Sequence, residues 1–245
     1  MFDFFKKHED FQNPLVVDLH SHLIPNVDDG SESISDSIEL LKEFESLGFQ
    51  KIITTPHIMN EFFPNNKEII YTALNSLQEE LNKQSIHIKI EAAAEYYLDE
   101  HFFESLIPSD DLLTFGKNYI LMETPFLNAP FFLKEAIFNL KSKGYQVILA
   151  HPERYMYLHN NLKLVEELKD MGTLFQVNTA SLSGFYSKAV QKFAVKLFKN
   201  RVVDFIGSDC HNMYQMQTIK KTLKSKIYQG LPFDDLLNNS LLVSE

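Results

Sequence analysis

The chain has 245 residues, of which 44% are hydrophobic and 23% charged, and its formal net charge is −10. These values are ordinary for a globular protein and exclude a disordered or fibrous chain; the acidic balance and the lack of a Lys/Arg cluster argue against a nucleic-acid-binding protein. No apolar run approaches the ~18 residues of a transmembrane segment, no signal peptide is recognisable, and the single cysteine, Cys210, excludes an intrachain disulfide and fits a reducing cytoplasm.

In chain order, short apolar runs rich in β-branched residues alternate with amphipathic helix patterns. The predicted strands are 15–20, 51–57, 88–95, 119–124, 146–152, 174–179 and 202–209. The predicted helices are 33–48, 66–83, 131–144, 162–172 and 187–200. The first of these helices begins at a serine and ends at Gly48, a residue type that favours helix ends. Near-continuous apolar strands that alternate with helices predict a parallel sheet covered by helices.

Seven such strands favour a closed or nearly closed α/β barrel, although the same alternation also fits an open, doubly wound sheet. Chains of this length often form one α/β barrel domain. We therefore expect a single domain over residues 15–245, preceded by an N-terminal arm, residues 1–14, to which the sequence assigns no role.

Imidazoles and carboxylates end most of the predicted strands. The first strand ends in His20 and His22, which alternation places on the same side of an extended segment. Two neutral imidazoles so placed suit a divalent metal ion. The polar residues at the later strand ends are His57, Glu95, Glu123, His151, Asn178, Asp209 and His211. Because the C-terminal ends of barrel strands meet at one face, we expect these side chains to converge there.

Each of these residues alone could be an ordinary turn or strand-end residue, but together they favour a metal site. A mixture of imidazole and carboxylate ligands suits Zn²⁺, Mn²⁺ or Fe²⁺ rather than Ca²⁺ or a thiolate-bound metal. Eight or nine candidate ligands are too many for one ion. The sequence therefore predicts two or three divalent ions that share bridging carboxylates.

Four motifs resemble those of the PHP (polymerase and histidinol phosphatase) superfamily. They are "DLHSHLIPNVDDG" (18–30), "TTPH" (54–57), "HPERY" (151–155) and "SDCH" (208–211). More narrowly, they are similar to the bacterial metal-dependent protein-tyrosine phosphatases of the CpsB/YwqE type. The resemblance covers residues 15 to about 215 and implies a distorted TIM-like (βα)7 barrel with three metal ions, often manganese.

The resemblance also implies roles for individual residues, which fall into three ligand sets and a catalytic pair. The set for one ion is His20, His22, Glu95 and Asp209. The set for a second ion, to which Glu95 would bridge, is Glu95, Glu123 and His151. The set for a third ion is Asp29, His57 and His211. The catalytic pair is Arg154, which would bind the phosphoryl group, and Asp209.

The implied activity is hydrolysis of phosphotyrosine on a protein, with water activated by the bound ions. The expected partner is a bacterial tyrosine kinase that controls capsule or exopolysaccharide synthesis. The expected metal is Mn²⁺, with Fe²⁺, Zn²⁺, Mg²⁺ and Co²⁺ as alternatives. The rings of Phe63 and Tyr155 are candidates for stacking on the substrate ring, although both could equally pack under a loop.

A cysteine-based mechanism does not fit the sequence. That chemistry needs an arginine six residues after the cysteine, and Met216 stands at that distance from Cys210. Alternation points Cys210 away from its neighbours Asp209 and His211, so we interpret it as a small buried spacer.

Three other functions remain open at this point. The first is a small-molecule phosphomonoesterase of the histidinol-phosphatase kind. The second is a nuclease-like PHP domain, against which the acidic charge argues. The third is a catalytically silent, metal-stabilised adaptor, against which the complete set of ligand positions argues.

Overall fold

The computed structural model describes residues 13–243, so almost all of the expected N-terminal arm lies outside the described residues. The strands are β1 (Val17–Leu19), β2 (Lys51–Thr54), β3 (His57–Ile58), β4 (Lys89–Ala92), β5 (Glu95–Tyr97), β6 (Tyr119–Glu123), β7 (Gln146–Ala150), β8 (Leu174–Asn178) and β9 (Phe205–Gly207). The α-helices are α1 (Ile34–Ser46), α2 (Lys67–Lys83), α3 (Ile107–Ser109), α4 (Leu133–Ser142), α5 (Met156–His159), α6 (Leu162–Asp170), α7 (Lys188–Lys199), α8 (Met213–Leu223) and α9 (Lys226–Gln229).

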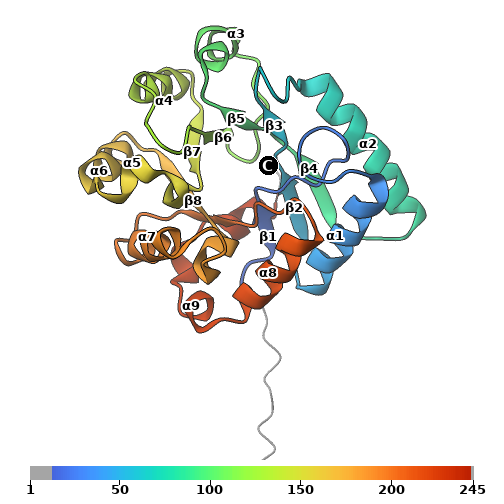
Figure 1. Ribbon diagram of the computed structural model, residues 1–245. Helices are drawn as coiled ribbons and strands as arrows, with labels where there is room; N and C mark the ends of the chain where they lie inside the picture. Colours follow the sequence, from blue (N-terminus) through green and yellow to red (C-terminus); the bar gives the residue numbers. More distant parts are fainter. Residues whose placement is uncertain (1–12, 244–245) are drawn as a thin grey trace, which may run out of the picture.

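The strands pair in parallel and form two sheets, in the orders β1–β2–β4 and β3–β5–β6–β7–β8–β9. The sheets continue one another because β3 follows β2 in the chain and β5 follows β4. At the other side, Ser21 after β1 forms a parallel bridge with Cys210 after β9, and the amide of Asp209 donates to the carbonyl of His20 at 2.7 Å. Seven strand positions therefore follow one another in barrel order, with the helices around them (Figure 1). This confirms the α/β class and the distorted barrel, built here from two sheets.

Two predicted strands, 51–57 and 88–95, are each divided in the structure. The first divides into β2 and β3 at Pro56, which has no backbone N–H to donate to a strand ladder. The second divides into β4 and β5 beside that break, because β4 pairs with β2 and β5 pairs with β3. The predicted first and last strands, 15–20 and 202–209, are also longer than the observed β1 and β9.

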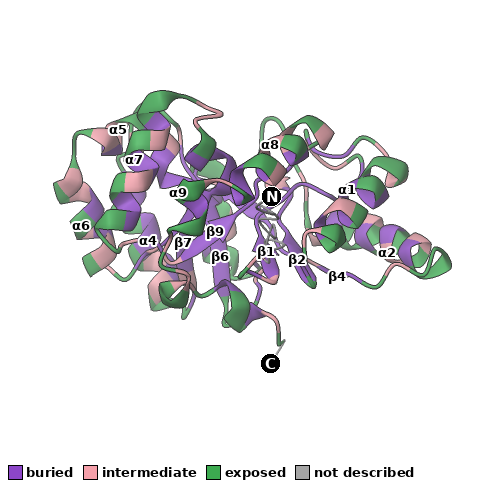
Figure 2. Cartoon of the chain, turned by 90° about the horizontal axis from the view of Figure 1, so that it is seen from below, coloured by how far each residue is buried: buried purple, intermediate pink, exposed green. Residues whose placement is uncertain are grey.

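The five predicted helices are confirmed, and side-chain caps explain where several of them begin. Ser33, Asn66 and Ser187 each accept a hydrogen bond from a backbone amide in the first turn of α1, α2 and α7. Helix α1 ends at Ser46, and Gly48 then takes a φ of +90°, which a glycine adopts without strain. Figure 2 shows the strands buried at the centre and the helices exposed on their outer faces. Within residues 13–243, no helix combines the length and apolar character needed to cross a membrane.

The C-terminal segment closes the gap between β1 and β9 at the end opposite the predicted site. The side chain of Asn238 accepts a hydrogen bond from the amide of Ile206 at 3.0 Å and donates to the carbonyls of Ile206 and Val17. Gly207 permits the close approach of the two strands, because a Cβ there would lie 2.1 Å from the carbonyl oxygen of Leu19. The barrel order therefore depends on contacts made by residues far apart in the sequence.

The buried carboxyl group of Asp18 in β1 is expected to make the stability of the fold depend on pH. Its carboxyl group is buried and accepts hydrogen bonds from the amide and hydroxyl of Ser208, and burial raises its pKa to about 8. Above the unfolded-state pKa of 3.8, the folded chain thus holds a proton that the unfolded chain has lost, so stability falls as pH rises towards 8. The Asp18→Asn side chain has nearly the same shape and can still accept a hydrogen bond, but it does not titrate.

Between about pH 5 and about pH 7.5, we expect the wild-type chain to lose about 2–3 kcal/mol of unfolding free energy relative to Asp18→Asn. Urea denaturation of both chains in EDTA at the two pH values measures this difference. If the unfolding free energies of the two chains changed equally with pH, Asp18 would be an ordinary ionised carboxylate in the folded chain.

Candidate metal centre

The structure brings all nine predicted ligand residues together. Their ligand atoms fall into four overlapping groups, and within each group the atoms lie within 4.8 Å of one another. These groups are His20–His22–Glu95, His20–His151–Asp209, His57–Glu95–Glu123 and His22–Asp29–His57–His211. The overlap of the groups is the arrangement that several ions sharing ligands would require. The assignment of each residue to a particular ion stays a prediction.

Glu95, the first residue of β5, lies at the middle of this cluster. Its Oε2 atom is 3.1 Å from Nε2 of His20, 3.2 Å from Nδ1 of His57 and 3.5 Å from Nε2 of His22. These four atoms are buried, and none makes a hydrogen bond within the described part of the chain. Buried polar atoms normally have partners, and a divalent cation would bind all four. The residues present therefore fit a metal centre.

The outer nitrogens of two histidines are held by hydrogen bonds. His20 contacts Oε1 of Gln176 through Nδ1 at 2.7 Å, and His22 contacts Oδ2 of Asp28 through Nδ1 at 2.6 Å. Each ring therefore presents its Nε2 atom to the centre. Such outer contacts fix the orientation and tautomer of metal-binding histidines.

Asp28 and Asp29 have different positions, although they are adjacent in the sequence. Asp29 is 57% exposed, and its carboxylate lies 3.4 Å from His211 and 3.7 Å from His57. Asp28 instead lies behind the histidines, where it also accepts from the amides of His57 and Gly30. We did not predict this supporting role of Asp28; the paired carboxylates of the "DDG" sequence were its one signal.

Three of the clustered residues have unusual backbone conformations. His20, His151 and Asp209 follow strand ends with φ values of 79°, 31° and 51°, in a region that residues other than glycine rarely adopt. Strain of this kind is retained where the surrounding structure requires it and concentrates at functional sites. Here it turns the chain at the strand ends that carry the candidate ligands.

The clustered charges shift the pKa values of the two central glutamates in opposite directions. Burial alone would raise the pKa of Glu95, but attraction to His20 and His57 outweighs it and holds that pKa well below its usual range. Burial and repulsion by Glu95 raise the pKa of Glu123 well above its usual range. One carboxylate therefore stays charged at the centre, and bound cations would favour ionisation of the second.

Arg154 lies beside this centre, in the short helical turn Pro152–Arg154 that follows β7 and His151. Its Nη1 donates to Oδ2 of Asp209 at 3.1 Å, and its side chain is 24% exposed. Two aromatic rings that the sequence did not single out, Phe126 and Tyr186, cover its guanidinium group. The predicted phosphoryl-binding residue is thus at the open face of the cluster.

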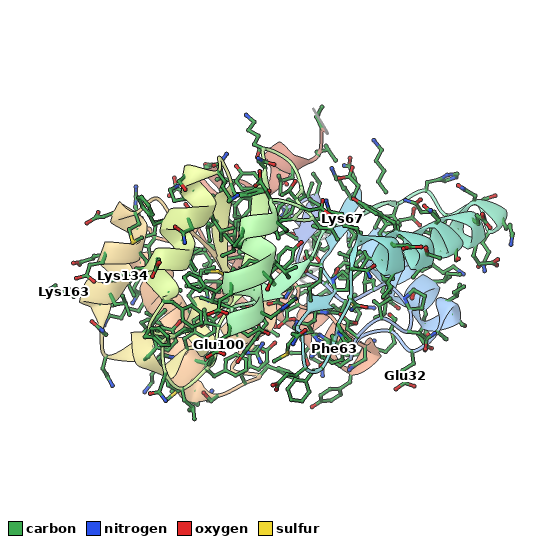
Figure 3. All side chains as sticks on the ribbon, turned by 90° about the horizontal axis from the view of Figure 1, so that it is seen from above. Glu32, Phe63, Lys67, Glu100, Lys134 and Lys163 are labelled. Atoms are coloured by element: carbon green, nitrogen blue, oxygen red, sulfur yellow. The ribbon has the colours of Figure 1, made fainter. Side chains whose placement is uncertain are left out.

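The two predicted stacking residues have different surroundings. Phe63 is partly exposed and stacks on His57, with ring centroids 5.5 Å apart. Figure 3 shows Phe63 on the same side of the molecule as Glu32, whose loop follows β1 and carries Asp29. Tyr155 is completely buried, and its hydroxyl accepts from the amide of Thr124 at 3.1 Å. The prediction that Tyr155 stacks on a substrate is therefore wrong, because its ring packs in the core.

Cys210 is buried between Asp209 and His211, as predicted. Burial raises the pKa of its thiol far above the usual range, so the nucleophilic thiolate does not form near neutral pH. For the phosphatase activity that the family resemblance implies, we expect Cys210→Ser to retain most of the rate and iodoacetamide to leave the wild-type rate unchanged, whereas EDTA should abolish it. Loss of turnover in Cys210→Ser at unchanged metal content would contradict this expectation.

The fold and the site together define an α/β barrel protein with a cluster of candidate metal ligands at one face of the barrel. The model of the family described as "Capsular polysaccharide synthesis, CpsB/CapC" matches residues 16–230. The chain therefore belongs to the CpsB/CapC family, which confirms the resemblance found in its motifs.

Several known proteins are similar over nearly the whole chain. Tyrosine-protein phosphatase YwqE of Bacillus subtilis is 28% identical, over 93% of this chain and 91% of that protein. Putative tyrosine-protein phosphatase CapC of Staphylococcus aureus is 29% identical, with the same coverage.

The solved structures show the same relationship. A match to structures of YwqE from Bacillus subtilis and CpsB from Streptococcus pneumoniae, described as unique metal-dependent tyrosine phosphatases, has a TM-score of 0.77 and 28% identity and covers 91% of this chain and 94% of that chain. Histidinol phosphate phosphatase from Lactococcus lactis has a TM-score of 0.56 at 17% identity, over 85% of this chain and 92% of that chain, and shares the fold.

Proposed function

We propose that this chain is a metal-dependent protein-tyrosine phosphatase. The observation that carries the proposal is the buried imidazole–carboxylate cluster around Glu95, with the guanidinium of Arg154 at its open face. The names of the relatives support the same activity. The fully buried thiol of Cys210 supports a mechanism that does not use cysteine.

Divalent ions bound by the nine clustered residues would supply positive charge for the phosphoryl oxygens and lower the pKa of water. Arg154 would contribute N–H donors to the phosphoryl oxygens, in the paired geometry that a guanidinium offers. Asp209 holds one edge of that guanidinium and so determines which N–H groups remain for the substrate. Because the phenolic leaving group has a pKa of about 10, it departs without a strong general acid.

Phe63 would contact the ring of a phosphotyrosine. It lies flat against His57, with an angle of 13° between the ring planes, and is partly exposed at the same face as the cluster. A substrate ring against Phe63 would extend this stack, whereas an aliphatic phosphate ester would leave it uncovered. This favours a substrate with an aromatic ring next to its phosphoryl group over a purely aliphatic phosphate ester.

The finer identity of the system is also part of the proposal. We infer that the ions are Mn²⁺, that the enzyme acts in the cytoplasm, and that its substrate is a tyrosine-phosphorylated kinase controlling capsule or exopolysaccharide synthesis. The description of the family model supports the link to capsule synthesis.

A substrate screen tests the proposed activity. The purified protein would be assayed with a phosphotyrosine peptide, a phosphoserine peptide, p-nitrophenyl phosphate and histidinol phosphate, after EDTA treatment and after addition of Mn²⁺, Zn²⁺ or Mg²⁺. We expect metal-dependent turnover with a clear preference for phosphotyrosine. A preference for histidinol phosphate would establish the small-molecule alternative, and no turnover with any metal would establish a silent adaptor.

A further inference from the structure

Two aromatic rings contact the guanidinium of Arg154. Its central carbon lies 4.5 Å from the ring centroid of Phe126 and 4.5 Å from that of Tyr186. Phe126 comes from the loop after β6, and Tyr186 from the loop between β8 and α7. Two separate loops therefore meet on one side chain, and both contacts are of the cation–π type.

One edge of the same guanidinium is also fixed. Nη1 of Arg154 donates to Oδ2 of Asp209 at 3.1 Å, and the hydroxyl of Tyr186 donates to the same oxygen at 3.2 Å. The side-chain amide of Asn178 donates to this oxygen at 2.6 Å. The aromatic contacts and the carboxylate together restrict the orientation of the guanidinium.

The two rings are themselves held in place. The carbonyl of Phe126 accepts from the amide of Met156 at 2.8 Å, which ties its loop to the segment just after Arg154. The hydroxyl of Tyr186 also accepts from the side chain of Asn178 at 3.3 Å. The ring of Phe126 is 37% exposed, so it is a wall of the open face rather than a core residue.

We propose that Phe126 and Tyr186 are positioning residues that clamp Arg154 edge-on for the phosphoryl group. A guanidinium that contacts two rings and is held at one edge by a carboxylate keeps its remaining N–H groups in a fixed direction, and a phosphoryl group accepts such N–H groups in pairs. Ordering the arginine before the substrate arrives removes an entropy cost from binding. The proposal rests on the proposed function for the identity of the ligand and adds two residues that act through Arg154.

The test uses three variants of the full chain with Mn²⁺ bound. Phe126→Leu and Tyr186→Leu remove a ring but keep an apolar side chain, whereas Tyr186→Phe keeps the ring and loses only the hydroxyl. We expect each leucine variant to weaken binding of inorganic phosphate, measured by titration calorimetry, and to lower kcat/KM for a phosphotyrosine peptide, both by about three- to thirtyfold. Tyr186→Phe should show much smaller effects than Tyr186→Leu, because it keeps the ring. The metal content should be unchanged in all three variants.

A double-mutant comparison separates clamping from direct contact with the substrate. If Phe126 acts through Arg154, then Phe126→Leu should have no further effect in the Arg154→Ala background. An undiminished effect of Phe126→Leu in that background would overturn the clamp and make Phe126 a substrate contact. Equal phosphate binding by wild type and both leucine variants would overturn it as well.

Matched controls come from exposed rings on the outer helices. Phe138→Leu on α4 and Tyr71→Leu on α2 make the same chemical changes away from Arg154, and both should bind phosphate as the wild type does. Failure of the proposed function would appear as a wild-type chain that hydrolyses none of the phosphate esters. The clamp is judged separately, on whether the leucine variants weaken phosphate binding.

Discussion

Replacing Glu95 with alanine should remove most of the bound metal and lower phosphatase activity by roughly a thousandfold or more, since the chemistry depends on the ions. The reason is the central position of this carboxylate. Its Oε2 lies within 3.5 Å of nitrogens of His20, His22 and His57, and its Oε1 lies 3.1 Å from Nε2 of His151. A group that faces four imidazoles is placed to bridge ions, so its loss should affect more than one of them.

Asp29→Ala is the matched comparison, because it also removes one carboxylate. Asp29 lies within 4 Å of His57 and His211 at the exposed rim, and it belongs to one of the four ligand groups, whereas Glu95 belongs to two. We therefore expect Asp29→Ala to retain more metal than Glu95→Ala. Glu79→Ala, at an exposed position on α2, should retain the wild-type amount.

Elemental analysis of the three purified variants measures this order directly. Thermal unfolding with and without Mn²⁺ gives a second readout, because an ion that binds the folded chain raises its melting temperature. The rise should be largest for the wild type and smallest for Glu95→Ala. Equal metal content in Glu95→Ala and Asp29→Ala would contradict the inference that Glu95 bridges ions.

The positions of the candidate ligands could be predicted because they follow from topology. In a parallel barrel, the C-terminal ends of the strands lie at one face, whatever their separation in the sequence. His20 and Asp209 are far apart in the chain, yet Nε2 of His20 and Oδ1 of Asp209 lie 3.3 Å apart. Reading the last polar residues of the predicted strands was therefore enough to find eight of the nine clustered residues, whereas Asp29, in the loop after β1, came only from the family resemblance.

The surroundings of the cluster could not be predicted in the same way. Asp28 supports His22 through a turn of the chain, and Phe126 and Tyr186 reach Arg154 from separate loops. Strand periodicity does not predict where loop side chains point. For the same reason, Tyr155 was wrongly predicted to face the substrate, although the short turn after β7 directs it into the core.

Replacing Arg154 with alanine is expected to lower kcat/KM for a phosphotyrosine peptide by roughly thirty- to a thousandfold. Two roles for this guanidinium predict different results. If it only formed a surface ion pair, its contribution would be about 0–1 kcal/mol, and activity would change by less than about fivefold. If it binds the phosphoryl group as charge develops, its loss costs ~2–4 kcal/mol, which gives the larger effect.

The structure favours the second role. Arg154 is mostly buried beside the cluster, between two rings, and its partner Asp209 is itself a candidate ligand rather than a surface acid. Burial alone would lower the pKa of the Arg154 side chain, but attraction to Asp209 raises it above its usual range, so the group stays positively charged. A fixed positive charge at this point is suited to the phosphoryl oxygens.

The measurement is steady-state kinetics on Arg154→Ala and Arg154→Lys, with metal content determined for each. Arg154→Lys should recover only part of the activity, because an ammonium group cannot make the planar, two-pronged contact. Arg201→Ala, at an exposed position, controls for the loss of one positive charge and should behave as wild type. If Arg154→Ala loses metal in proportion to its activity, the residue acts by holding Asp209. If it keeps both metal and near-normal activity, the phosphoryl contact is absent, and the tyrosine-phosphatase proposal loses the residue that connects its metal centre to its substrate.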